Sequence, residues 1–349
     1  MRLAVVGNPG SRRVDLFTAA VRRAGLPAPT VMPWLTLLTS RPAPFEPFCR
    51  VRIESPGEHA EVDRLLRGAP AVLAHGEIGA SASWFAGFSA ALDAVGALAV
   101  DAQLLSQPAD IRVMFDKSAC HARLAAAGIA VPPALPIAPS TWDELRAACP
   151  WRRVFVKPRH GSSASGVIAL EFGSAGRVQA TTSVELVGGN LFNSLRVRKY
   201  RNEADIAAIV NRLGPDGLHV ERWYPKADLR GYVLDVRVVL VDGRPSHVVG
   251  RGSRTSPMTN LHLGGTRIDA SAIRAAAGER AWAEAMHTCT RIAGLFPRTL
   301  QMGVDLMFGT GWRGHAVAEV NAFGDLIPGL LADGLDTYDA QVRALSVMA

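Results

Sequence analysis

The feature that most constrains the fold of this chain is residues 303–324, which read GVDLMFGTGWRGHAVAEVNAFG. Two short apolar runs flank a Gly-rich turn, and this pattern predicts a β-hairpin. Because successive side chains of a strand point to opposite faces, Asp305 has a defined face on the first strand, and Glu319 and Asn321 share one face of the second. A turn centred near Trp312 places Asp305 across from Glu319.

This hairpin is a candidate metal site. Like charges directly opposite each other destabilise a sheet, so a cation is expected between Asp305 and Glu319. Mg²⁺ takes oxygen ligands in octahedral geometry and usually shares them with substrate phosphates, which suits two carboxylates and the amide oxygen of Asn321. We therefore expect Mg²⁺, or Mn²⁺, at this hairpin. Taken alone, the hairpin leaves a second interpretation open, in which the acids simply point into water.

Composition limits the class of protein. The chain has 349 residues, which suggests two or three domains. Its contents of 48% hydrophobic and 20% charged residues are typical of a soluble globular protein. The most apolar region, residues 71–105, contains His75, Glu77 and Asp93, so no run is long enough to cross a bilayer. We expect no membrane partner.

The N-terminal residues, the cysteines and the net charge indicate the cellular location and the partners to expect. The first apolar run is too short for a signal peptide, and the four cysteines are scattered without a CxxC pair, which argues against a zinc site. We therefore expect a cytoplasmic protein with reduced thiols. The net charge of +7 would permit nucleic-acid binding. Because Lys and Arg are spread along the chain with no dense basic run, we expect no nucleic-acid partner and take the charge as background, helped by a site for polyanionic phosphates.

The first 100 residues alternate strands and helices. Residues 2–7 are apolar, GNPGSR follows, and residues 14–24 have the spacing of an amphipathic helix. GNPGSR is not GxGxxG, so we interpret this start as a plain βα unit. The alternation predicts a small α/β domain with a parallel sheet. Its further elements are a strand at 48–53, a helix at 58–67, a strand at 71–75, a helix at 81–94 and a strand at 97–100.

A second informative stretch is VFVKPRHGSSASGVIAL, residues 154–170. Alternation buries its first two valines and sends Phe155 and Lys157 to the other face. Residues 161–166 form a Gly/Ser turn that offers several backbone N–H groups to an anion. It is not a Walker A loop, since no GK[ST] follows, and an ordinary hairpin turn is the alternative interpretation. Helices are predicted before it at 112–128 and 141–148, with Ser140 as the cap of the latter.

The remaining segments predict a mixture of strands and helices. Strands are expected near 178–186 and 195–200, and the run LDVRVVLVDGRPSHVVGR predicts two strands joined by an Asp-Gly turn. Asp235 and Arg237 share one face of the first of these strands, although such a pair is commonly a surface ion pair. TSPMTNLHLGG predicts a mobile loop. Helices are expected at 203–213, 270–293 and 338–345.

The order of short motifs carries a resemblance that no single motif does. The motifs follow one another in an order that resembles the ATP-grasp superfamily, over about residues 116–331. They are DK, VKP with the Gly/Ser loop, ERW, DVR, NLHLGG, GVD and EVN. The chain resembles RimK-type glutamate ligases and glutathione synthetases most, while its Gly/Ser loop looks closer to D-alanine–D-alanine ligases. GNPGSR and NAFGDLIPGL do not match these members, so we expect a separate branch.

The resemblance implies an α/β (α+β) fold in three parts. These are a Rossmann-like N-terminal α/β domain at 1–110, a small lid subdomain with the Gly/Ser loop at 111–220, and a C-terminal ATP-grasp subdomain with the metal site at 221–349. By the same resemblance the ATP-binding residues are Lys117, Lys157, Gly161, Ser162, Ser163, Gly166, Glu221, Arg222, Trp223, Tyr224 and Asp235; the catalytic ones are Arg237, Arg251 and Asn260; and the metal ligands are Asp305, Glu319 and Asn321.

The implied activity is that of an ATP- and Mg²⁺-dependent ligase. It would join the carboxylate and the amine of small-molecule or peptide substrates into an amide through an acyl phosphate, with a homodimer as the candidate oligomeric state. Elementary chemistry agrees, because an ATP site needs point charges such as Lys117 and Lys157, loop amides and a divalent ion bridging the phosphates. Two alternatives stay open: a phosphotransferase acting on a hydroxyl, and a non-catalytic ATP-binding module.

Overall fold

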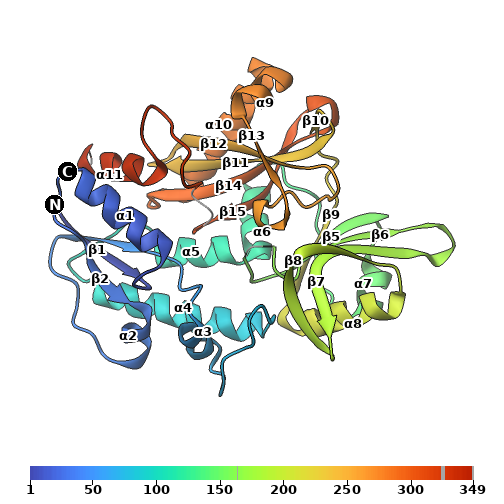
Figure 1. Ribbon diagram of the computed structural model, residues 1–349, viewed down its shortest axis with the longest axis horizontal. Coiled ribbons are helices and arrows are strands. Elements are labelled where there is room, and N and C mark those ends of the chain that lie inside the picture. Colours follow the sequence, from blue (N-terminus) through green and yellow to red (C-terminus); the bar gives the residue numbers. More distant parts are fainter. Residues whose placement is uncertain (163, 324–326, 348–349) are drawn as a thin grey trace.

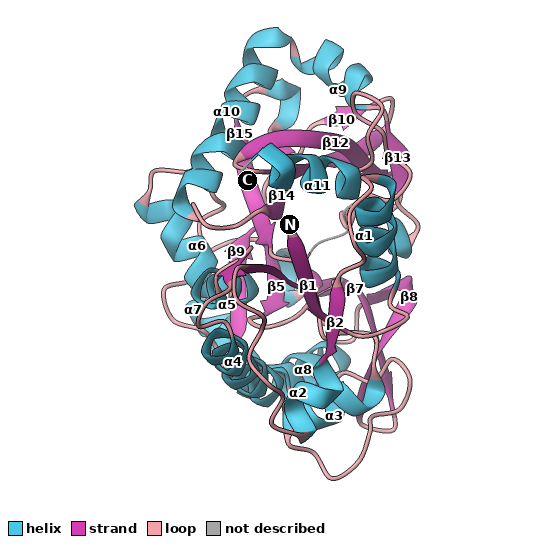
Figure 2. Cartoon of the chain, turned by 90° about the vertical axis from the view of Figure 1, so that its left-hand side faces the viewer, coloured by secondary structure: helices cyan, strands magenta, loops and turns pink. Residues whose placement is uncertain are grey.

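The protein is described by a computed structural model that covers residues 1–162, 164–323 and 327–347. Its strands form three sheets, and helices cover them (Figure 1). Helix α11 (Thr337–Val347) lies beside α1 (Arg12–Arg23), where Arg23 pairs with Asp336 and Asp339 (Figures 1 and 2). Among the described residues, no helix is both long and apolar enough to cross a membrane.

The N-terminal sheet is parallel, as the alternation predicts. Its strand order is β2-β1-β3-β4, with β1 at Arg2–Gly7, β2 at Thr30–Pro33, β3 at Cys49–Ile53 and β4 at Gln103–Leu104. The strands expected at 71–75 and 97–100 are wrong: the first segment is irregular, and the second begins inside a helix. The alanines of the second segment favour helix over strand. The helices of this part are α1, α2 (Trp34–Thr39), α3 (Ala60–Arg67), α4 (Ser81–Leu98) and α5 (Pro108–Phe115).

Close packing of α3 against α4 depends on a glycine. A Cβ atom on Gly87 would lie 2.0 Å from the backbone oxygen of Leu66, so no side-chain rotation could relieve the clash. We expect Gly87→Ala to lower the free energy of unfolding by about 1–3 kcal/mol, measured by urea denaturation. Gly96→Ala, in the same helix, is the matched control, because its Cβ would meet only Pro108 at 3.9 Å. A Gly87→Ala protein as stable as the wild type would contradict this account of the packing.

The second sheet, here called the lid sheet, is antiparallel with the order β8-β7-β6-β5-β9. In β5, Val154 and Val156 are fully buried while Phe155 and Lys157 face the other way, as predicted. Thr141, and not Ser140, caps the helix before β5, because its side chain accepts from the backbone N–H of Glu144. The strands of the lid sheet and the helices near it are α7 (Trp142–Ala148), β5 (Arg153–Pro158), β6 (Ile168–Phe172), β7 (Val178–Val187), β8 (Asn190–Tyr200), α8 (Glu203–Leu213) and β9 (Leu218–Arg222).

The third sheet, here called the floor sheet, has the order β13-β12-β11-β14-β15, with β10 paired to β11. The Asp-Gly turn predicted between β11 and β12 is present, and Asp242 and Gly243 both have positive φ, at 49° and 76°. Leu234, Val236 and Val238 of β11 pack into the same apolar core as Ile292 of α10. The elements are β10 (Asp228–Leu229), β11 (Tyr232–Val241), β12 (Arg244–Ser253), β13 (Thr266–Ile268), α9 (Ala270–Ala277), α10 (Glu279–Leu295), β14 (Gln301–Phe308) and β15 (His315–Asn321).

Two helices predicted as continuous are each broken by one residue. The helix expected at 270–293 divides into α9 and α10 at Gly278, whose φ of 83° and ψ of 153° no helix contains. The helix expected at 112–128 divides at Asp116, whose φ of −91° and ψ of 102° are extended. Asp116 accepts from the backbone N–H of Ala119 and pairs with Arg159 of the lid. The break therefore starts α6 (Lys117–Ala126) beside the lid and places Lys117 at the first helical position.

Candidate functional site

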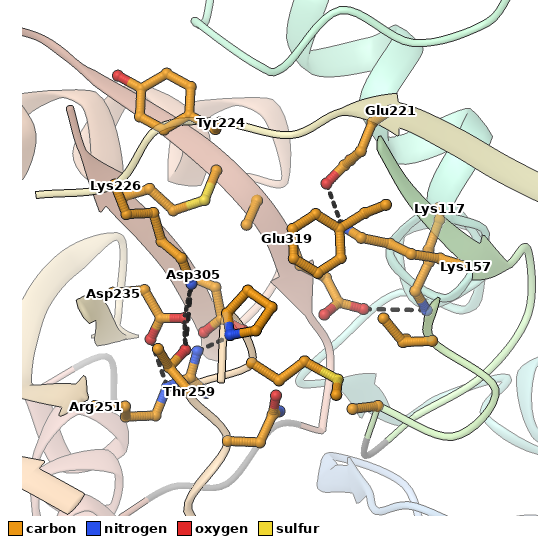
Figure 3. Close-up of a pocket in the computed structure, with 18 of the residues that line it drawn as sticks. Lys117, Lys157, Glu221, Tyr224, Lys226, Asp235, Arg251, Thr259, Asp305 and Glu319 are labelled. Carbon is orange, nitrogen blue, oxygen red and sulfur yellow. Dashed lines mark hydrogen bonds and ion pairs between the residues drawn. The ribbon is translucent and has the colours of Figure 1, made fainter. Parts of the chain in front are cut away.

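The candidate site is a pocket between the lid sheet and the floor sheet (Figure 3). It holds about 780 Å³ of space free of protein atoms, a volume that includes open solvent, and small-molecule sites are concave clefts of this kind. Charged side chains of both signs line it together with Phe155, Met258 and Met307. The predicted site residues among its lining are Lys117, Lys157, Gly161, Ser162, Glu221, Tyr224, Asp235, Arg251, Asn260, Asp305 and Glu319.

The hairpin carboxylates occupy the positions that alternation predicts. β14 and β15 are adjacent and antiparallel, Asp305 lies opposite Glu319, and both side chains line the pocket. The pairing register shifts after Asp305, so that Leu306 pairs with Val317 and Ala318 becomes the extra residue of a bulge. This shift was not visible in the sequence. The two carboxylates therefore converge on one space, as a shared cation requires.

On the floor sheet, charges of alternating sign follow one another in a buried network. Arg251 donates from Nε to Asp235 at 2.8 Å, and its Nη2 lies 3.0 Å from Asp305. Arg237 donates to Asp305 from the other side. Burial works against the charged form of Asp305, but the guanidinium groups of Arg237 and Arg251 outweigh it and hold its pKa below the usual range. The network fixes the side chains that face the pocket.

On the lid side, two lysines meet carboxylates and the Gly/Ser loop. Lys157 Nζ lies 2.6 Å from Glu221 Oε1, and His219 Nε2 lies 3.3 Å from the other oxygen of Glu221. Burial opposes ionisation of Glu221, yet Lys157 and His219 hold its pKa at about 2. Lys117 Nζ donates to the carbonyl oxygen of Gly161 at 2.7 Å and lies 3.2 Å from Glu319 Oε1. Lys117 thus connects the loop, α6 and the hairpin.

Some predicted site residues lie outside the pocket lining. Arg222 is exposed, and Trp223 packs on Phe155 with ring centroids 5.1 Å apart. Arg237 is not part of the pocket lining, but it donates to Asp305, which is. Gly166 and Asn321 do not line the pocket, and Ser163 lies outside the described residues. The roles assigned to all of these residues stay predictions.

Asp235 has a different setting from the ribose contact expected of it. One of its oxygens accepts from Arg251, and the other accepts from the hydroxyl of Thr259. The ammonium of Lys226 lies 3.6 Å from the same carboxylate. Asp235 therefore holds cations on the floor of the pocket, and its contact with a ribose stays a prediction.

Lys226 and Thr259 line the pocket and were missed by the sequence interpretation. Lys226 follows the hinge in the segment YPKA, which contains no recognisable motif. The folded chain buries the neighbouring Ala227 in the core, so the side chain of Lys226 faces the opposite way, toward the pocket. Thr259 precedes Asn260 in the polar segment that was interpreted as a mobile loop.

The hairpin residues suit a hard divalent cation by their donor chemistry. Asp305 and Glu319 supply carboxylate oxygens, and the buried side-chain nitrogen of Asn321 has no hydrogen-bond partner within the described part of the chain, so its amide is not committed elsewhere through that atom. In the described ranges, no three His, Cys, Asp or Glu side chains gather as a metal cluster. Mg²⁺ is usually held by one or two carboxylates, with water and substrate phosphates completing its shell, and the two hairpin carboxylates fit that pattern.

Lys157 gives a test of the anion-binding side of the pocket. Lys157→Met is expected to weaken ATP binding by about 1.5–3 kcal/mol, because it deletes a charge-assisted contact; isothermal calorimetry measures this. The variant also leaves Glu221 buried without its ammonium. The double variant Lys157→Met/Glu221→Gln is therefore the matched control, in which no unpaired carboxylate remains. If the double variant regained ATP affinity together with thermal stability, Lys157 would have only a structural role.

Comparison with known proteins identifies the fold. No protein-family model and no curated protein matches the chain. A crystal structure of D-cycloserine synthetase DcsG matches at 21% identity with a TM-score of 0.59, over 100% of this chain and 99% of that one. The ATP-grasp ligase PsnB with a minimal precursor matches at 17% identity with a TM-score of 0.57, over 100% and 99%.

A third match is the RimK domain protein ATP-grasp from Sphaerobacter thermophilus, at 14% identity with a TM-score of 0.57, over 98% of each chain. All three matches extend over nearly the whole length of both proteins, so the N-terminal sheet is part of the likeness. The chain has the ATP-grasp fold, and the fold class expected from the sequence is confirmed.

Proposed function

We propose that this protein is an ATP-dependent carboxylate–amine ligase. A substrate carboxylate attacks the γ-phosphate of ATP to give an acyl phosphate and ADP, and an amine then displaces phosphate to form an amide. The observation that carries the proposal is the convergence of Asp305 and Glu319 in a pocket that Lys117 and Lys157 also line. The names of the solved neighbours, a D-cycloserine synthetase and an ATP-grasp ligase, support the same reaction class.

Each part of the pocket has a role in this reaction. Lys117, Lys157 and the amides of the Gly/Ser loop bind the phosphates of ATP. Arg251 presents a guanidinium at the floor of the pocket and stabilises negative charge on the transferring phosphoryl group. Asp305, Glu319 and Asn321 would hold Mg²⁺ or Mn²⁺, which when bound neutralises phosphate charge.

The apolar part of the lining suits the base of the nucleotide. Phe155 comes from the lid sheet and Met307 from the floor sheet, and Met258 lies in the segment after β12. Tyr224 of the hinge also lines the pocket. A planar purine fits between such side chains, while the charged groups hold the phosphates. With the lid sheet closed over it, the acyl phosphate is kept from water.

The substrates are proposed only as classes: a small-molecule or peptide carboxylate and an amine. Peptide substrates are included because another solved structure of PsnB is a complex with a precursor peptide. The main rival is a phosphotransferase acting on a hydroxyl, since the same phosphate site would serve it. A non-catalytic nucleotide-binding module is the second rival, and the complete set of lysines and hairpin carboxylates argues against it.

Hydroxylamine separates these functions. The protein is incubated with Mg²⁺, ATP and pools of amino acids and short peptides, and ADP release is followed with and without hydroxylamine. A ligase forms an acyl phosphate, which hydroxylamine converts to a hydroxamate that mass spectrometry identifies together with its parent carboxylate. ADP release with a stable phosphorylated alcohol and no hydroxamate would indicate a kinase. Nucleotide binding without ADP release from any pool would favour the non-catalytic module.

A further inference from the structure

Lysine is rare in this chain and concentrated in one place. Only four of its 38 Lys and Arg residues are lysine: Lys117, Lys157, Lys199 and Lys226. Three of the four line the candidate pocket, and Lys199 is exposed on β8. Arginine presents a broad planar fork, whereas lysine presents a compact charge that approaches a phosphate as a point. A chain that uses arginine almost everywhere else thus has three compact ammonium groups around one space.

The ammonium of Lys226 has donors to spare. Its side chain is 6% exposed, and its two polar contacts within the described residues are Thr259 Oγ1 at 3.5 Å and Asp235 Oδ2 at 3.6 Å. Both are long for a hydrogen bond from an ammonium group. The other two pocket lysines have contacts of 2.6 Å and 2.7 Å. Burial lowers the pKa of Lys226, and the nearby carboxylate of Asp235 acts in the opposite direction without offsetting this effect. A lowered pKa of this kind is typical of a buried cation that has too few anionic partners.

The backbone holds Lys226 in this position. The backbone N–H of Ala227 donates to Phe308 at 2.8 Å, and that of Thr310 donates to Pro225 at 3.0 Å, so the segment adds to the end of β14. Lys226 itself forms a backbone bridge with Gly309. On this segment the side chain of Ala227 enters the core and that of Lys226 enters the pocket. The ammonium is therefore placed before any ligand arrives.

The position of Lys226 indicates which part of the nucleotide its ammonium group would contact. Lys117 and Lys157 approach from the lid side, and Lys226 approaches from the floor side, across the pocket (Figure 3). Its neighbour Asp235 is joined through Arg251 to Asp305, the hairpin carboxylate proposed to hold the metal. A metal held there would neutralise charge on the phosphates that react. Lys226 thus lies on the wall that faces the end of the triphosphate.

We propose that Lys226 binds the terminal phosphoryl group of ATP, as the third phosphate lysine of the pocket. This inference rests on the proposed function, because it assumes that ATP occupies this pocket. It adds a contact that discriminates ATP from ADP on the floor side, where the Thr259 hydroxyl and Asp235 hold the ammonium until the phosphoryl group arrives.

The test compares two nucleotides by calorimetry in the presence of Mg²⁺: ADP and the non-hydrolysable triphosphate AMP-PNP. For Lys226→Met we expect the Kd of AMP-PNP to rise about tenfold or more, while the Kd of ADP changes by less than about twofold. Lys157→Met is expected to weaken both nucleotides. Lys199→Met is the matched control, since it removes the lysine outside the pocket, and it should weaken neither.

The outcomes separate this inference from the proposed function. Unchanged AMP-PNP binding by Lys226→Met, or an equal loss for ADP and AMP-PNP, overturns the terminal contact while leaving the ATP site intact. A wild-type protein that binds neither nucleotide overturns both proposals. If Lys226→Met fails to fold because Asp235 loses a cation, the double variant Lys226→Gln/Asp235→Asn removes both charges, and the same two Kd values decide the question.

Discussion

Glu319→Gln is expected to lower the rate of phosphoryl transfer about a hundredfold or more, the largest effect on chemistry among our predictions. The substitution preserves the shape of the side chain and removes one of the two facing hairpin charges. A metal held with less negative charge neutralises the reacting phosphates less well, and that neutralisation matters most in the transition state. The measurement is single-turnover ADP formation with the substrate pool that supports the wild-type enzyme, at saturating ATP.

Nucleotide binding should survive in Glu319→Gln, because the lysines and the Gly/Ser loop remain. Glu284→Gln is the matched control, since it removes an exposed carboxylate on α10 that is not part of the pocket lining. Wild-type turnover by Glu319→Gln would refute the metal assignment. A loss of AMP-PNP binding as large as the loss of rate would show instead that Glu319 acts on ground-state binding.

Arg251→Met is expected to lower the free energy of unfolding by about 3–5 kcal/mol, the largest effect on stability. Arg251 lies between Asp235 and Asp305, which are 7% and 6% exposed, so its removal leaves buried carboxylates short of a cation. Arg237 still pairs with Asp305, but among the described residues Asp235 then keeps only Thr259 and the distant ammonium of Lys226. Urea denaturation monitored by tryptophan fluorescence measures the change.

An exposed ion pair provides the comparison for Arg251→Met. Arg274 of α9 pairs with Glu279 at the surface, so Arg274→Met should change the unfolding midpoint little. The triple variant Arg251→Met/Asp235→Asn/Asp305→Asn should recover much of the lost stability, because no buried carboxylate is then unpaired. If Arg251→Met unfolded at the same urea concentration as the wild type, the network would not contribute to folding.

Two kinds of local pattern gave correct predictions. One is the alternation of side chains along a strand, and the other is the Asp-Gly turn. Alternation in β5 and β14 fixed the faces of Lys157 and Asp305 without any knowledge of the partner strands. The Asp-Gly turn fixed the pairing of β11 with β12, since both turn residues adopt the positive φ that such a hairpin requires. Face and register together were enough to bring Asp305 and Glu319 to one pocket.

Single residues that interrupt an otherwise regular pattern, or that act through distant partners, could not be predicted in this way. Asp116 interrupts a run that is otherwise regular for a helix, because its carboxylate caps α6 and binds Arg159, which is distant in sequence. No helix or strand was predicted between residues 24 and 48, yet this segment contains β2 and α2, and Trp34 is fully buried there. Lys226 was missed because its neighbours Asp235 and Thr259 come from other segments, and only the folded chain brings them together.

The contact between Lys117 and Glu319 has a consequence for the order in which reactants can be accommodated. At 3.2 Å, the ammonium already neutralises the carboxylate that a metal would need, so free Mg²⁺ must compete with an internal counter-ion. Phosphate oxygens of a nucleotide offer Lys117 a replacement partner and thereby release Glu319. Metal and nucleotide affinities should therefore be coupled, each raising the other by the same factor. The protein would resist loading with Mg²⁺ alone and accept it readily as the nucleotide complex.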